Sequence, residues 1–61
     1  MRRTIRWALN ELARGQKAIS MNQLYRVSHL KPRQLIENQA YVVEVATELD
    51  LPFRAGCPLA P

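Results

Sequence analysis

Hydrophobic residues recur with the period of an α-helix in three segments of this chain. In the first segment, residues 4–14, the apolar positions follow the spacing i, i+3, i+4, i+7 and share one helical face: Ile5, Ala8, Leu9 and Leu12. Thr4 is a suitable N-cap, and Gly15 follows the last turn, where a left-handed residue commonly ends a helix. The pattern predicts a first helix over about residues 4–14.

The second and third segments carry start signals of their own. Ser20 and Gln23 have the spacing of a capping box, which predicts a helix over residues 21–28. Pro32 is favoured at the first position of a helix, because its missing N–H would have no partner there. A third helix is expected over about residues 32–50, with two adjacent apolar stripes: Leu35, Val42, Ala46 and Leu49 on one, Ile36, Ala40 and Val43 on the other.

These segments predict an all-α fold, with a small three-helix domain over residues 1–51 and an irregular Pro-rich C-terminal tail over residues 52–61. Residues 41–45 favour a strand by composition, yet their apolar positions do not alternate, so the helix is expected to continue through them. The tail holds three prolines and a glycine in ten residues, which excludes regular structure. Phe53 and Leu59 are expected to pack on the body or on a neighbouring chain.

The length of 61 residues excludes several kinds of function. A chain this short buries only about 60% of the surface that its unfolded form exposes, which leaves no room for a substrate pocket inside its own core. Cys57 is the single cysteine and His29 the single histidine, so neither an internal disulfide nor a zinc site is expected. We therefore expect a binding protein that is not an enzyme and has no cofactor and no metal.

The hydropathy pattern also bears on location. No apolar run approaches the roughly 18 residues that a membrane span requires. The apolar stretch after the charged start is interrupted by Asn10 and Glu11, which is too early for a signal peptide. A cytoplasmic protein without membrane association is expected, in which Cys57 stays reduced and is dispensable.

Charge divides the chain into two unequal halves. Residues 1–33 hold eight Arg and Lys side chains and one Glu, whereas residues 34–61 hold one Arg and four acidic side chains. Seven of the nine cations are Arg, which suits bidentate contacts with phosphate and with guanine edges. A basic half of this kind is typical of nucleic-acid binding. Binding to an acidic protein, or solubility alone, would also account for it.

Residues 24–35, with the sequence LYRVSHLKPRQL, resemble a helix-turn-helix motif, and the resemblance extends over about residues 21–40. Leu24, Leu30 and Leu35 match the apolar positions that hold the two helices of the motif together. Two positions depart from it: Tyr25 stands where a small residue is usual, and His29 stands where glycine usually opens the turn. The resemblance implies a second helix that enters the major groove of DNA.

The resemblance also implies roles for individual residues. The first turns of the third helix would face base edges and flanking phosphates through Lys31, Arg33, Gln34, Glu37 and Asn38. The phosphates or the minor groove would be contacted by Arg26 and by an N-terminal arm that carries Arg2, Arg3 and Arg6. For Glu37 the alternative is an i,i+4 ion pair with Arg33.

We predict a dimeric double-stranded-DNA-binding protein, a transcriptional regulator or an accessory protein of a phage, plasmid or other mobile element. The second apolar stripe of the third helix exceeds what a 61-residue monomer covers, so a homodimer is expected, with these interface residues: Ile36, Ala40, Val43 and Phe53. One alternative is a protein-interaction module in which Trp7 and the N-terminal arginines grip an acidic partner, unless Trp7 packs on the tail. The other is an RNA- or ribosome-associated protein.

Overall fold

The structure, a computed structural model, describes residues 1–54, and this part of the chain forms four helices and no strand. They are α1 (Arg2–Gly15), α2 (Met21–Ser28), α3 (Pro32–Glu37) and α4 (Gln39–Glu48). The expected all-α fold is confirmed. The predictions about Cys57 and Leu59, and about the tail after Arg54, lie outside the described residues.

Helix α1 is longer than its apolar pattern predicts. Met1 is the N-cap, and its carbonyl oxygen accepts the N–H of Ile5 at 3.0 Å, so Thr4 lies inside the helix and is not its cap. Arginine has a high helix propensity, which explains why the two residues before Thr4 continue the helix instead of forming a free arm. At the other end Gly15 is still helical, and the C-cap is Gln16 in an extended conformation.

Helix α2 begins as its capping box predicts. The N–H of Gln23 donates to Ser20 Oγ at 3.4 Å, and the N–H of Ser20 donates to Gln23 Oε1 at 2.8 Å. These two bonds satisfy two of the N–H groups that the first turn of a helix leaves without partners. The helix ends at His29, whose φ of 58° and ψ of 18° lie in the left-handed region.

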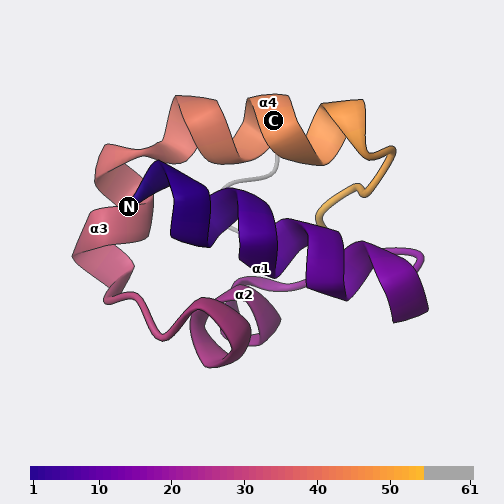
Figure 1. The fold of residues 1–61 in the computed structure, drawn as a ribbon, viewed down its shortest axis with the longest axis horizontal. Helices are drawn as coiled ribbons and strands as arrows, with labels where there is room; N and C mark the ends of the chain where they lie inside the picture. Colours follow the sequence, from indigo (N-terminus) through magenta and orange to yellow (C-terminus); the bar gives the residue numbers. More distant parts are fainter. Residues whose placement is uncertain (55–61) are drawn as a thin grey trace.

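The predicted third helix is wrong in one respect, because it divides at Asn38 into α3 and α4. Asn38 has φ −107° and ψ 22°, and its side-chain amide donates to the carbonyl oxygen of Gln34 at 2.9 Å. An asparagine side chain that binds a backbone carbonyl competes with the helical hydrogen bonds, and the chain turns there. Figure 1 shows α3 at one end of the molecule and α4 running away from it. Residues 41–45 are helical, as expected.

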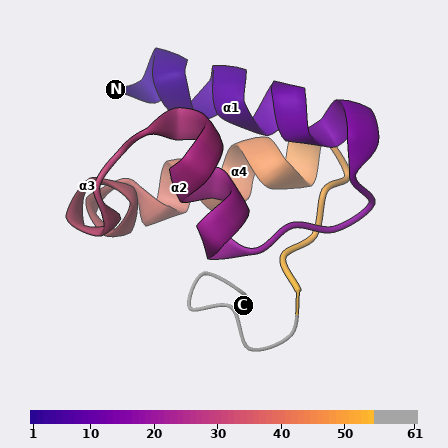
Figure 2. The ribbon, with the colours of Figure 1, turned by 90° about the horizontal axis from the view of Figure 1, so that it is seen from below.

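Helix α1 forms a layer of its own. In Figure 1 it runs between α4 and α2, and in Figure 2, after a 90° turn, it lies above them. The core beneath it is made of the buried apolar residues of all four helices and two linkers: Ile5, Ala8, Leu9, Leu12, Ile19, Met21, Leu24, Leu35, Val42, Val45 and Leu51. The apolar face predicted for residues 4–14 is therefore the inward face of α1.

The segment after α4 returns to the linker between α1 and α2. The N–H of Ile19 donates to the carbonyl oxygen of Pro52 at 3.1 Å, and the N–H of Arg54 donates to the carbonyl oxygen of Ile19 at 2.8 Å. Phe53 is half-buried and packs against the core. These contacts fix residues 52–54 on the body of the domain.

Candidate nucleic-acid interface

The turn between α2 and α3 joins two helices that share the core. Leu24 and Leu35 are fully buried, and Leu30 in the turn is partly buried against them. His29 adopts the left-handed conformation at the position where a helix-turn-helix usually has glycine. Tyr25, in place of the usual small residue, is accommodated at the edge of the core with part of its surface exposed.

A hydrogen bond inside the turn sets the path of the chain into α3. Ser28 is 5% exposed, and its hydroxyl oxygen accepts the N–H of Leu30 at 3.2 Å. The side chain of Gln34 then accepts the N–H of Lys31 at 2.9 Å, which takes up a free donor at the start of α3. Pro32 occupies the first turn of α3, as predicted. The turn is therefore held by its own side chains and by buried leucines.

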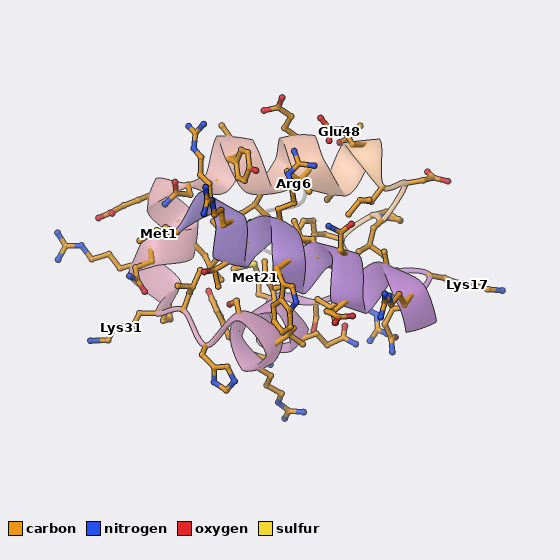
Figure 3. The ribbon with its side chains drawn as sticks, viewed as in Figure 1. Met1, Arg6, Lys17, Met21, Lys31 and Glu48 are labelled. Carbon is orange, nitrogen blue, oxygen red and sulfur yellow. The ribbon has the colours of Figure 1, made fainter. Side chains whose placement is uncertain are left out.

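Three of the predicted DNA contacts are cations that are exposed around this turn: Arg26, Lys31 and Arg33. The side chain of Lys31 extends from the turn away from the body of the domain (Figure 3). The side chain of Arg33 is 89% exposed, and its Nε donates to Glu37 Oε1 at 3.0 Å. The i,i+4 ion pair considered for Glu37 is therefore present, and both of its members remain at the surface.

The side chains of Gln34 and Asn38 are less available for DNA contacts than the sequence pattern suggests. Gln34 is half-buried and its side-chain oxygen is engaged by the N–H of Lys31. Asn38 is also half-buried, and its amide nitrogen lies 2.9 Å from both the carbonyl oxygen of Gln34 and the sulfur of Met1. Both side chains shape the α3–α4 segment, a role that their spacing alone did not reveal.

The arginines at the start of α1 are divided between solvent and the surface of α4. Arg6 Nε donates to the hydroxyl oxygen of Tyr41 at 3.1 Å, and its terminal nitrogens lie 3.4 Å from Glu48 Oε2. The guanidinium carbon of Arg2 lies 4.8 Å from the centre of the Tyr41 ring, a cation–π geometry. Arg3 is exposed and has no ion pair among residues 1–54.

The contacts of Arg6 stabilise its charge. The hydrogen bond to the hydroxyl of Tyr41 raises the pKa of the Arg6 guanidinium above its ordinary value, and the nearby Glu48 adds to the effect. Figure 3 shows the Arg6 and Glu48 side chains close together where α1 passes α4. Residues 42 positions apart make this contact, and no local sequence pattern could have found it.

The positive charge of the described chain is spread over more than one place. Lys17 and Lys31 lie at opposite ends of the long axis in Figure 3. Arg14 is 3.3 Å from Glu11 in an exposed pair. The cations of residues 1–33 therefore lie in several places: on α1, in the linker that carries Lys17, and around the turn between α2 and α3.

Part of the predicted oligomer interface is gathered in one place. Ile36, Ala40 and Val43 line a shallow groove across α3 and α4, together with Glu37 and Gln39. Ile36 is 57% exposed, which is unusual for so large an aliphatic side chain. Phe53 packs on the core instead and does not line this groove.

Neither a metal-binding cluster nor a membrane-spanning helix is found in residues 1–54. No group of three or more His, Cys, Asp and Glu side chains in this range could hold a metal ion. No helix within it has both the length and the apolar character needed to cross a membrane. Comparisons with protein-family models, curated proteins and solved structures found no match to this chain.

Proposed function

We propose that this protein binds double-stranded DNA through the turn between α2 and α3, as a small cytoplasmic regulator of transcription or an accessory protein of a mobile element. The observation that carries the proposal is the exposure of Lys31 in the turn and of Arg33 in the first turn of α3, beside the buried Leu24 and Leu35. A rigid support for exposed cations is what phosphate and base recognition requires.

The geometry of the turn supports the likeness to a helix-turn-helix. The left-handed conformation of His29 lets α2 end abruptly, so that α3 starts in a new direction. Since α3 has only six residues, its contacts with a DNA groove are confined to its first turns. Glu44 and Glu48 lie beyond the break at Asn38, on α4, away from such a groove.

Arg33 is proposed to read a base edge, because a guanidinium at the start of a recognition helix can donate two hydrogen bonds to guanine. Its pair with Glu37 is exposed and weak, so exchange for a DNA contact costs little. Arg26 and Lys31 are proposed to contact phosphates. On α1, Arg3 is the arginine best placed to add a phosphate contact, whereas Arg6 is held by Tyr41 and Glu48.

Self-association is part of the proposal. The groove lined by Ile36, Ala40 and Val43 exposes apolar surface next to the break between α3 and α4. Two copies joined there would present two α2–α3 turns to one duplex, which is how small DNA-binding proteins of this kind gain affinity.

A protein-interaction module is the second candidate, and one observation favours it. Trp7 is 54% exposed on α1, and a tryptophan at the surface is typical of a contact that dominates a protein interface. Under this alternative the arginines of α1 would bind an acidic protein, and the turn between α2 and α3 would have no ligand.

A duplex titration at several salt concentrations distinguishes the two functions. We expect binding that weakens with salt, because each neutralised phosphate releases counterions. Lys31→Ala should weaken binding to cognate and random duplexes alike and reduce the salt slope by about one. Lys17→Ala is the matched control, since Lys17 is an exposed lysine at the opposite end of the molecule.

Two outcomes would contradict DNA binding at this site. If Lys17→Ala and Lys31→Ala weaken binding to the same extent, the association is non-specific attraction to a basic chain. If structured RNA competes better than duplex DNA, the RNA alternative takes its place.

A further inference from the structure

An aromatic and basic stripe runs along the outer face of α1. Its members are spaced at i, i+4, i+7 and i+11 and are all exposed: Arg3, Trp7, Asn10 and Arg14. This stripe lies opposite Ile5, Leu9 and Leu12, which are buried in the core. Trp7 is the only tryptophan of the chain and the most exposed of its described aromatic side chains. The core of the domain makes no use of it.

The groove across α3 and α4 has the opposite character. Its lining is mostly apolar, with Ile36, Ala40 and Val43, and it also includes Gln39 and Glu37, which pairs with Arg33. Glu44 is exposed one helical turn after Ala40 on the same helix, and it has no ion pair among residues 1–54. An apolar floor with carboxylates beside it is complementary to an indole flanked by guanidinium groups.

We infer that the Trp7 stripe of one copy of this protein docks into the α3–α4 groove of a second copy. The indole of Trp7 covers Ile36, and Arg14, whose exposed pair with Glu11 is weak, meets the carboxylate of Glu44. The inference rests on the proposed self-association but not on DNA binding.

The position of the two surfaces determines the symmetry of the assembly. The stripe belongs to α1 and the groove to α3 and α4, which are different parts of the molecule in Figure 1. A contact between unlike surfaces is heterologous, so an open assembly keeps one free stripe at one end and one free groove at the other until a ring closes. The assembly therefore grows head to tail, one copy at a time.

A contact between two grooves explains the observations less well. It would leave Trp7 exposed in both copies. The head-to-tail contact covers both exposed apolar surfaces and pairs opposite charges.

The test is complementation between two variants, measured by sedimentation in the absence of DNA. Trp7→Ala removes the stripe and keeps the groove, whereas Ile36→Asp keeps the stripe and spoils the groove. Both side chains are more than half exposed, so both variants should retain the helical circular dichroism of the wild type. Asn22→Asp, which adds the same charge at an exposed position on α2, is the matched control.

We expect wild type and Asn22→Asp to associate beyond dimers as concentration rises from micromolar to millimolar. Trp7→Ala alone and Ile36→Asp alone should each stay monomeric at concentrations where the wild type already associates. Their self-association should be weakened at least about tenfold, since an interface tryptophan is typically among the strongest contacts. An equal mixture of the two should form a one-to-one dimer and nothing larger, because it contains one intact stripe facing one intact groove.

Tryptophan fluorescence gives a second readout on the wild type. Because Trp7 is the only tryptophan, its emission should shift to shorter wavelength as the protein associates. A mixture that stays monomeric would contradict the inference, and so would a wild-type monomer at every concentration. If Trp7→Ala still dimerises, the groove is occupied by another groove, and the proposed self-association survives without this contact.

Discussion

The arginines on α1 and the single arginine of α3 have the same chemistry but different surroundings. Arg6 is fixed between Tyr41 and Glu48, where α1 passes α4, and connects two helices that are distant in sequence. Arg33 has only a local partner, Glu37, and its side chain is 89% exposed. An arginine that contacts both Tyr41 and Glu48 is less available to a phosphate than one with a single local partner. Charge counted along the sequence does not distinguish the two.

The largest effect is expected where the α2–α3 turn is joined to the core. Leu35→Ala removes a fully buried side chain and should lower the free energy of unfolding by about 2–5 kcal/mol. Ile36→Ala, at the exposed neighbouring position, should change it by less than about 0.5 kcal/mol. Urea unfolding followed by circular dichroism measures both. Equal losses in the two variants would mean that the turn is not supported by the core.

A smaller effect, on DNA affinity and not on stability, is expected at Arg33. Arg33→Ala should cost about 1–3 kcal/mol in affinity for the best duplex and reduce the preference between duplexes. Its effect on unfolding should stay within about 0.5 kcal/mol, which is the usual range of an i,i+4 pair. A competition titration on cognate and random duplexes gives the first quantity. Unchanged affinity would exclude Arg33 from the DNA contact.

Replacement of His29, the left-handed residue of the α2–α3 turn, is expected to stabilise the fold. His29→Gly should raise the free energy of unfolding by up to about 1 kcal/mol, because a side chain at φ 58° is strained and glycine is not. Asp50 has φ 54° after α4, so Asp50→Gly is a matched substitution at a turn remote from the proposed contact. If His29→Gly destabilises the fold, contacts of the His29 side chain outweigh the strain.

The smallest effect is expected at the arginine held by its own fold. Arg6→Gln breaks exposed contacts with Tyr41 and Glu48, so the melting temperature should fall slightly, and less so at high salt. DNA affinity should change less than it does in Arg3→Gln, the matched change at an exposed neighbour on α1. A larger loss of DNA affinity in Arg6→Gln than in Arg3→Gln would contradict this prediction.

Local signals in the sequence were enough for the fold class and for several boundaries. Helical periodicity identified the buried faces around Leu9, Leu24 and Leu35. The capping box at Ser20 and the proline at the start of α3 located two helix starts. Each of these signals acts within a few residues, through side-chain spacing or a hydrogen bond to the nearby backbone, so it is visible without the rest of the molecule.

The candidate site could be predicted only in part. Lys31 and Arg33 are exposed beside the turn, as their position at the start of a helix suggested, and Ile36, Ala40 and Val43 do share one groove. The groove members lie close in sequence, and helical spacing alone brings them together. Phe53, from the tail, was predicted for the same interface; it is half-buried against the core and does not line this groove.

The sequence by itself determined which faces are apolar, where α2 and α3 begin, and which half of the chain is basic, because these properties depend on neighbours within one or two helical turns. Tertiary structure decided the rest. Asn38 could have continued a long helix, but the chain turns there, and its amide meets both Gln34 and Met1 from the far end of the sequence. Arg6 meets Glu48 across 42 positions for the same reason. Contacts of this kind depend on how α1 lies across α4, which is set by the packing of the whole core and leaves no trace in local spacing.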